Sequence, residues 1–297
     1  MSAASNTASV QAERAIRQPR SNLSKSLRPL LKNGLVMSGF ALVLLMLFLA
    51  IFAPLLSPRD PIGQDIANGL KAPASSWLFG TDRFGRDILS RVIYGSRISL
   101  WVAFASITVA VVVGSIFGLL SGYLGGWVDN IISRIMDVFF SFPSLFLAIA
   151  VAAILGPGLN NAILAIAVVY APFFSRVVRG PVLAERGKEY VEAARVIGGS
   201  TRQIIFSHIL PNVVSPVIVQ GSVVLSQAIL IEASLSYLGL GTQPPDPSWG
   251  TMLNEGRTFL ELAPWMSIFP GLAIMLAVLG FNLVGDGLRD VLDPKAR

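Results

Sequence analysis

The chain has 297 residues, of which 53% are hydrophobic and only 13% are charged, and its mean hydropathy is +0.66. A water-soluble domain could not bury that much apolar surface, so the composition predicts a protein that crosses a membrane. The sequence contains no cysteine, which excludes disulfide bonds, thiol catalysis and cysteine-bound metal ions.

Residues 1–33 form a basic, polar segment rich in Ser, Ala, Asn and Gln, and we expect a disordered or peripheral tail. An apolar run at 34–56 follows, which is either a cleaved signal peptide or an uncleaved membrane anchor. It is longer than the apolar core of about 7–15 residues in a signal peptide, and its basic preamble is long, so an anchor is favoured. We therefore predict a first transmembrane helix at 34–56 and a loop at 57–95.

Four more apolar runs without charged residues lie at 98–128, 138–175, 213–231 and 262–285. A transmembrane helix needs about 20 apolar residues, so the run at 138–175 is too long for one crossing. Glycine, proline and asparagine are concentrated at 156–161, in its middle. We expect two helices joined there by a tight hairpin, which makes six transmembrane helices and an all-α fold.

The basic residues predict the orientation of these helices. With six crossings, both termini lie on one side, together with the loops after the second and fourth helices. That side carries most of the Lys and Arg residues, so it is cytoplasmic by the positive-inside rule. This topology and contact with anionic lipid account for the net charge of +6, so nucleic-acid binding is not needed to explain it. The tails at 1–33 and 291–297 are then cytoplasmic, and the loop at 57–95 is extracytoplasmic.

The stretch at 185–212, called the polar segment below, lies in the predicted cytoplasmic loop between the fourth and fifth helices. Tyr190, Ala194 and Ile197 recur at i, i+4 and i+7, so we expect them to line one face of a short helix. The residues alone leave two readings of this segment. It is either an amphipathic helix that lies on lipid or a docking surface for a soluble partner.

The end of this short helix and the start of a second one are also predicted. Gly198 and the glycine after it should end the first helix, because glycine readily adopts the left-handed conformation common at helix C-termini. Ser200 and Gln203 have the spacing of a capping box, which should begin a second helix. Pro211 and Pro216 should then mark the start of the fifth transmembrane helix.

Charged residues close in sequence suggest local ion pairs. Glu192 can pair with Arg195 at i, i+3. Asp129 and Asp137 flank Arg134 and are expected to pair with it at the membrane surface.

Three further features have structural and functional readings. Glu232, near the far end of the fifth helix, either lines a solute path or forms a structural ion pair. The block at 81–87 holds two acids and two bases and is expected to form ion-paired packing against a partner chain or against loops, rather than to contact substrate. Gly114, Gly118 and Gly122, followed by glycines at 125 and 126, should allow close helix packing in the second helix.

No enzyme motif is present in the sequence. The Gly187-Lys188 pair resembles the end of a P-loop, but that motif needs glycine where Val182 stands. His208 is the sole histidine, so a histidine-based metal cluster is impossible, and there is no Gly-x-Ser-x-Gly elbow. We therefore predict no catalytic, metal or cofactor site in this chain.

The polar segment contains Glu-Ala-Ala at 192–194, followed by Gly198 and by Ile-Leu-Pro at 209–211. This pattern resembles the EAA loop of bacterial ABC importer permeases. His208 stands where the general pattern has isoleucine, and this variant is similar to the dipeptide/oligopeptide/nickel branch. Three further blocks resemble the C-type permease of that branch: GTDRFGRD at 80–87, LSYLGLG at 235–241 and NLVGDGLRD at 282–290.

The resemblance implies a type I importer permease fold, with a five-helix core at 96–290, in a bacterial inner membrane. It also implies a homologous B-type permease that completes the solute path, two ATPase subunits that bind ATP and Mg, and an extracytoplasmic solute-binding protein. Peptides are the expected substrate. The residues implied to couple the chain to the ATPases are Tyr190, Glu192, Ala193, Ala194, Arg195, Ile197, Gly198 and Ser200. The alternative is an autonomous channel or ion-coupled secondary transporter, which would usually place ionisable groups and broken helices at the membrane midplane.

Overall fold

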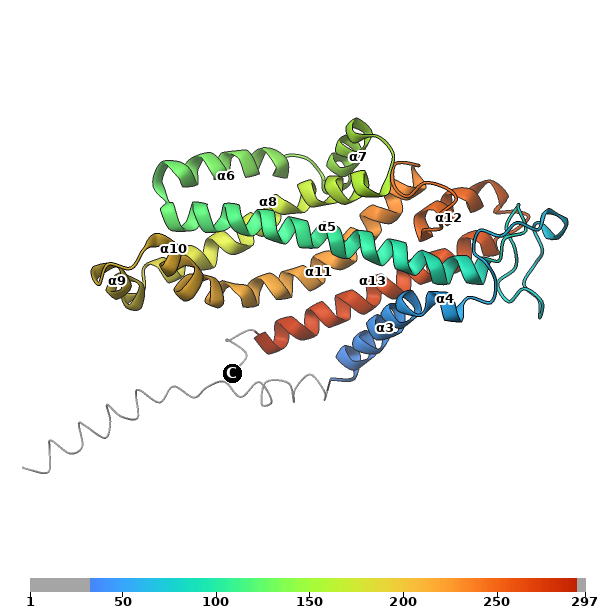
Figure 1. Cartoon of the computed structure of the whole chain (residues 1–297), viewed down its shortest axis with the longest axis horizontal. Coiled ribbons are helices and arrows are strands. Elements are labelled where there is room, and N and C mark those ends of the chain that lie inside the picture. Colours follow the sequence, from blue (N-terminus) through green and yellow to red (C-terminus); the bar gives the residue numbers. More distant parts are fainter. Residues whose placement is uncertain (1–32, 293–297) are drawn as a thin grey trace, which may run out of the picture.

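The computed structural model describes residues 33–292, so nearly all of the two predicted tails lies outside the described residues. The regular elements in this range are helices (Figure 1). They are α3 (Gly34–Ile51), α4 (Ala53–Leu56), η1 (Ile66–Asn68), α5 (Ile88–Leu124), α6 (Gly126–Phe140), α7 (Ser144–Leu155), α8 (Leu159–Arg186), α9 (Glu189–Val196), α10 (Thr201–Gln203), η2 (Ile204–Ile209), α11 (Leu210–Tyr237), α12 (Trp249–Gly256), η3 (Arg257–Phe259) and α13 (Trp265–Leu292).

Within the described range, five helices are long and apolar enough to cross a membrane: α3, α5, α8, the continuous helix from α10 to α11, and α13. The predicted count of six holds when α6 and α7 are taken together as one broken span, bent by 93°. The break was not predicted. It falls at the Ser141-Phe142-Pro143 sequence, where proline has no backbone N–H to continue the helix and disfavours helical geometry at the residue before it.

The predicted hairpin at 156–161 is confirmed, because α7 ends at Leu155 and α8 begins at Leu159. Gly156 and Gly158 make this turn with φ angles of +87° and +147°, which residues with a side chain rarely adopt.

Helix α5 begins at Ile88, inside the stretch that the sequence had assigned to a loop ending at residue 95. Asp87 caps it, since its carboxylate accepts a hydrogen bond from the Ser90 backbone N–H at 2.8 Å. The apolar run begins only at residue 98 because Arg91 and Arg97 lie in the first turns of the helix. A helix start inferred from the first residue of a run without charges is therefore too late in the sequence.

Helices α5 and α8 make the most extensive helix pair of the bundle, and the predicted glycine face lies between them. A Cβ atom at Gly114 would lie 2.4 Å from the Ala171 carbonyl oxygen, and one at Gly118 would lie 2.6 Å from the Ser175 carbonyl oxygen. The close approach therefore requires glycine. Glycines 125 and 126 do not belong to this face, because they form the turn into α6 with positive φ angles.

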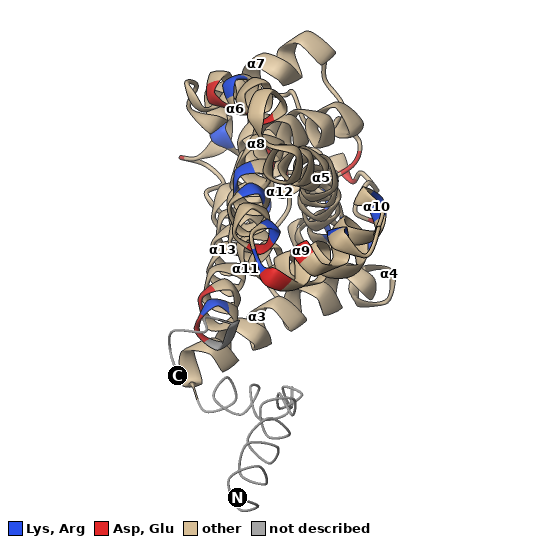
Figure 2. Ribbon diagram, turned by 90° about the vertical axis from the view of Figure 1, so that its left-hand side faces the viewer, with Lys and Arg blue, Asp and Glu red and all other residues tan. Residues whose placement is uncertain are grey.

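Helices α3 and α13 pack antiparallel. Gly287 lies against Val36, and Gly280 lies against Leu42 and Val43. The first and last helices of the described chain therefore have their outer ends on the same side of the bundle, as an even number of crossings requires. Viewed from the end that carries α9 and α10, most of the ribbon belongs to residues other than Lys, Arg, Asp and Glu (Figure 2).

The second predicted helix of the polar segment is not separate from the fifth transmembrane helix. Helix α10 continues through the π-helical turn η2 directly into α11, so that one helix runs from Thr201 to Tyr237. Pro211 lies at the start of α11, directly after the π-helical turn, and Pro216 lies inside the helix without ending it. The prediction that these prolines mark the start of the fifth transmembrane helix holds for Pro211, at the start of α11, but not for Pro216, which lies further inside it.

Candidate functional site

The polar segment lies at one end of the bundle, and α12 lies at the other (Figure 1). Its first helix, α9, packs against the bundle through Val191 and Ala194, which are buried. These side chains join a small apolar cluster with Val178 and Val182 of α8 and Ile204 of η2. The segment is therefore held against the two helices that it connects.

Tyr190, Ala194 and Ile197, which were predicted to line one face of the helix, differ in burial, and only Ala194 packs against the bundle. Ala194 is buried, but Tyr190 is 41% exposed and Ile197 is 85% exposed. Periodicity grouped the longer Tyr190 and Ile197 with Ala194, whereas the tight junction with α8 accepts the smaller Val191 and Ala194. Ile197 is thus available to a partner.

Tyr190 fastens α9 at its edge. Its hydroxyl donates a hydrogen bond to the Glu185 carboxylate and accepts one from the Asn212 side-chain amide at 3.3 Å. Burial and the hydrogen bond to Glu185 raise the pKa of Tyr190 to about 12, so the phenol stays neutral at physiological pH. Lys188 forms an ion pair with the same Glu185 carboxylate at 2.5 Å. This group of contacts links the end of α8, α9 and the start of α11.

The predicted glycine elbow is confirmed. Helix α9 ends at Val196, and Gly198 follows with a φ angle of +84°. The Gly199 backbone N–H donates a hydrogen bond to the Ala194 carbonyl at 2.9 Å, which closes the turn. Ser200 then caps α10 by accepting a hydrogen bond from the Gln203 backbone N–H at 3.3 Å.

The tip of the polar segment is apolar and exposed. Val196 is 87% exposed and Ile197 is 85% exposed, and the neighbouring Glu192 and Ala193 are exposed as well. Val196 was missed by the sequence reasoning, although it directly precedes Ile197 at the end of the helix. Arg195 does not pair with Glu192 among the ion pairs of the described residues, and its guanidinium lies over the Tyr123 ring, 5.3 Å from the centroid.

A buried ionic cluster occupies the α12 end of the bundle. Arg86 pairs with Asp82 at 2.5 Å and with Glu255 at 2.8 Å, and Arg91 pairs with the same Glu255 oxygen at 3.0 Å. Arg86 and Arg91 are almost fully buried. The prediction that the block at 81–87 forms ion pairs is confirmed within this chain, where Arg86 pairs with Asp82 of the block and with Glu255 from a distant part of the sequence.

Two predicted charge interactions are replaced by others. Asp129 accepts two hydrogen bonds from the Arg179 guanidinium, both at 2.6 Å, and Asp137 pairs with Arg176 at 3.1 Å. The expected pairing with Arg134 is therefore wrong. Arg176 and Arg179 lie on α8 and hold α6 along it.

Glu232 is 1% exposed, and one of its carboxylate oxygens accepts a hydrogen bond from the Ser236 hydroxyl at 2.8 Å. Its partner is thus a hydroxyl group, and the structural ion pair that was one of its two readings is not among the ion pairs of the described residues. The side chain is enclosed by its own chain in this structure and does not reach a surface that a solute could contact.

Comparison with known proteins identifies the family. Residues 110–297 match the family described as "Binding-protein-dependent transport system inner membrane component". The chain belongs to this family. Residues 21–73 also match the N-terminal TM domain of oligopeptide transport permease C. The permease is therefore a multi-pass membrane component of an ABC importer. It is a transport subunit and not an enzyme, and it works with ATPase and binding-protein partners.

Similar proteins cover nearly the whole permease. It is 48% identical, over 92% of its length and 90% of the relative's, to the dipeptide transport system permease protein DppC of Alkalihalophilus pseudofirmus. It is 44% identical, over 96% of both chains, to the probable D,D-dipeptide transport system permease protein DdpC of Escherichia coli K12. The glutathione transport system permease protein GsiD of Escherichia coli O6:K15:H31 is 45% identical over 90% of this chain and 88% of its own.

A solved structure supports the fold. The inward-facing MetNI methionine ABC transporter has a chain that aligns with a TM-score of 0.53 and 24% identity, over 69% of the permease and 97% of that chain. At this identity the likeness concerns the fold alone. It agrees with the predicted type I importer permease fold.

Proposed function

We propose that the permease imports short peptides as one half of a solute path, which a homologous B-type permease completes. The polar segment then receives the motion of two ATPase subunits, and these partner chains bind ATP and Mg. The support for peptides is the substrate named for several relatives of similar length. The excess of basic residues on the side of the polar segment supports a cytoplasmic location for that segment and for both termini.

The observation that carries the coupling role is the exposed apolar tip of a braced segment. Val196 and Ile197 project from the bundle, while Val191 and Ala194 anchor the same helix from the opposite face. Exposed apolar side chains on an otherwise polar segment are typical of a protein interaction site. We therefore place Val196 beside the eight residues that the resemblance implied.

The geometry also supplies a route for the motion. From Ser200 onward a single helix continues to Tyr237, near the opposite end of the bundle. A displacement at the tip can therefore be transmitted along one helix, without a flexible joint at Pro211 or Pro216. Glu232 lies inside the bundle near the far end of this helix, so we do not place it on the solute path.

A matched pair of substitutions tests the coupling role. Ile197 in the tip and Ile154 near the α7–α8 turn are both 85% exposed. If Ile197 is buried against an ATPase, Ile197→Ser should weaken the association about 10- to 100-fold, because burial of such a side chain stabilises by about 1.5–3 kcal/mol. Ile154→Ser should not change it. Copurification of the ATPases and ATP-driven uptake of a labelled dipeptide, with the cognate binding protein present, measure both effects.

Equal ATPase binding and uptake by the two variants would show that the tip is not the coupling surface. Binding of peptides to the cognate binding protein tests the substrate separately. A binding protein that captures no short peptide, with no peptide uptake by the unmodified transporter, would overturn the substrate and leave the coupling role standing.

A further inference from the structure

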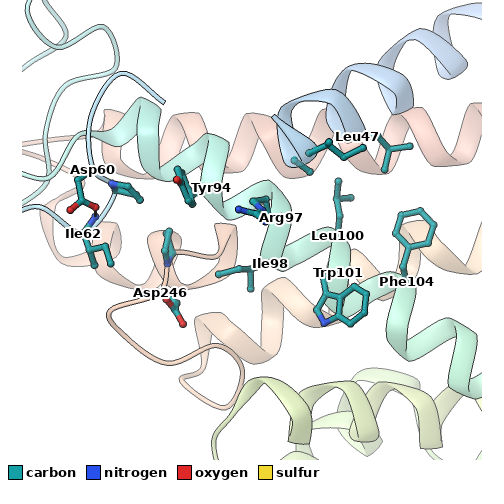
Figure 3. Close-up of a pocket in the computed structure, with 14 residues that line it drawn as sticks. Leu47, Asp60, Ile62, Tyr94, Arg97, Ile98, Leu100, Trp101, Phe104 and Asp246 are labelled. Carbon is teal, nitrogen blue, oxygen red and sulfur yellow. Dashed lines mark hydrogen bonds between the residues drawn. The ribbon is translucent and has the colours of Figure 1, made fainter. Parts of the chain in front are cut away.

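A cavity of about 940 Å³ lies at the α12 end of the bundle, away from the polar segment (Figure 3). We call it the outer cavity. Its walls come from the second half of α3, the first turns of α5, and two loops that follow α4 and α11. The residues that line it include Asp60, Ile62, Tyr94, Arg97, Trp101, Phe104 and Asp246. Four separate segments therefore build one concave site.

Charges of both signs face the outer cavity. Asp60 and Asp246 come from the two loops, and Arg97 comes from α5 (Figure 3). All three side chains are exposed, and none takes part in an ion pair with another described residue. One oxygen of Asp60 accepts a hydrogen bond from the Ile62 backbone N–H at 3.0 Å, which fixes the carboxylate and leaves its other oxygen available.

The contrast with the neighbouring ionic cluster is informative. Arg91 lies on the same helix as Arg97 and is buried, and it is neutralised by Glu255. Unlike Arg91, the three charged residues that line the outer cavity are exposed and have no ion-pair partner among the described residues. Unpaired charges of both signs around one cavity complement a ligand that carries both a cation and an anion.

Aromatic side chains supply the remaining surface. Trp101 is 62% exposed, and Tyr94 and Phe104 line the same wall of α5. Small-molecule sites have volumes of about 300–1,000 Å³ and combine apolar walls with a few placed polar groups. The outer cavity has both properties.

We propose that the outer cavity receives the peptide from the extracytoplasmic side, with the α-ammonium group near Asp60 and Asp246 and the α-carboxylate on Arg97. The side chains of the peptide contact Tyr94 and Trp101. This assignment rests on the proposed import of short peptides and on the proposed orientation, and it names the groups of this chain that first contact the substrate.

Phe104 is the lining residue of α5 that lies furthest along the helix from its start. Its ring packs edge-to-face on Phe281 of α13, with the centroids 5.7 Å apart. A second cavity of about 380 Å³, between α5, α11 and α13, is also lined by Phe104, together with Thr108 and Ser222. Phe104 therefore borders both spaces.

The lack of cysteine in the chain allows a direct test, because a single introduced thiol reports on one place. Ile62 lines the outer cavity and is 41% exposed, whereas Ile66 in the same loop is 74% exposed and lies outside it. Ile62→Cys and the matched control Ile66→Cys are prepared in the assembled transporter, and labelling of this chain by a water-soluble maleimide is followed with and without dialanine.

Dialanine should slow the labelling at Ile62→Cys, by about tenfold at about ten times its dissociation constant, and should leave Ile66→Cys unchanged. N-acetyl-dialanine amide carries neither charge and should not protect. Adding Arg97→Gln to Ile62→Cys should remove the protection, while Arg97→Lys should restore part of it, because lysine retains the charge and loses the bidentate geometry. Ile98→Cys, at another lining position, serves as the second reporter if Ile62→Cys does not assemble.

Equal protection by dialanine and its uncharged analogue, or no protection by either, would overturn the assignment. So would a thiol at Ile62 that reacts in the isolated permease but not in the assembled transporter, because a partner chain or lipid would then fill the outer cavity. Uptake of dialanine by the unmodified transporter distinguishes failure of the proposed peptide site from failure of the proposed substrate. Uptake without protection overturns the outer cavity alone, whereas absence of peptide uptake overturns the proposed substrate.

Discussion

The contact between α5 and α8 should be intolerant of even one added methyl group. Gly118→Ala would place a Cβ 2.6 Å from the Ser175 carbonyl oxygen and 2.7 Å from the Val178 Cβ. Carbon atoms in a packed interior lie about 3.5–4.0 Å apart, so the two helices would have to separate by about 1 Å. The atoms met by the new methyl group belong to backbone or to a β-branched side chain, and neither can swing away.

The magnitude follows from two opposing effects. Overpacking of this kind typically destabilises by about 1–3 kcal/mol. Alanine also favours a helix interior over glycine by about 1 kcal/mol, which partly offsets the loss. Gly221→Ala, in α11, isolates this second effect, because a Cβ there would have no neighbour within 4 Å. Gly118→Ala should therefore be less stable than Gly221→Ala by about 1–3 kcal/mol.

The assay is equilibrium unfolding of the purified permease in mixed micelles, with the free energy of unfolding measured for both variants and the unmodified chain. Gly221→Ala should exceed the unmodified chain by up to about 1 kcal/mol, and Gly118→Ala should lie about 0–2 kcal/mol below it. Equal stability of the two variants would refute the reasoning, since it would mean that α5 and α8 are not in van der Waals contact at Gly118.

Two further substitutions test other contacts. Glu255→Gln should lower the free energy of unfolding by about 3–5 kcal/mol, because it leaves Arg86 and Arg91 buried without the carboxylate that they share. Asp246→Asn removes an exposed and unpaired charge and should change the free energy of unfolding little in the same assay. Similar effects of the two substitutions would contradict the buried cluster. Tyr190→Phe should weaken the attachment of α9 by about 0.5–1.5 kcal/mol and speed amide hydrogen exchange in α9, with Tyr237→Phe as the control. Unchanged exchange in α9 would show that the Tyr190 hydroxyl does not hold this helix in place.

The features that were predicted correctly depend on short stretches of sequence. The hairpin at 156–161 and the elbow at Gly198 follow from glycine's access to positive φ angles, which no distant contact has to supply. The lengths of the apolar runs likewise follow from the thickness of a membrane. Four motifs in the right order were enough to predict the family.

The features that were missed depend on partners far away in the sequence. Helix α5 could include Arg91 because Glu255 neutralises it from another part of the chain. Asp129 pairs with Arg179 on a different helix, in preference to the nearby Arg134. The buried face of α9 was set by the space that α8 leaves, and periodicity alone could not reveal that space.

The outer cavity was missed for the same reason. Asp60, Arg97 and Asp246 are separated by long stretches of chain, and each alone is an unremarkable charged residue at the end of an apolar run. Only the fold brings them around one space.

The π-helical turn at Ile204–Ile209 holds more residues per turn than the α-helix on either side of it. Deleting one residue from this turn would convert it to ordinary α-helix and would keep the helix unbroken. The part of this helix before the turn, α10, would then rotate by about 100° about the helix axis relative to α11, which is the angle per residue of an α-helix. The number of residues in the π-helical turn thus sets the direction in which the chain at Val196 and Ile197 leaves this helix. Removing one residue there would change the direction of the tip relative to α11 without altering any residue of the tip itself.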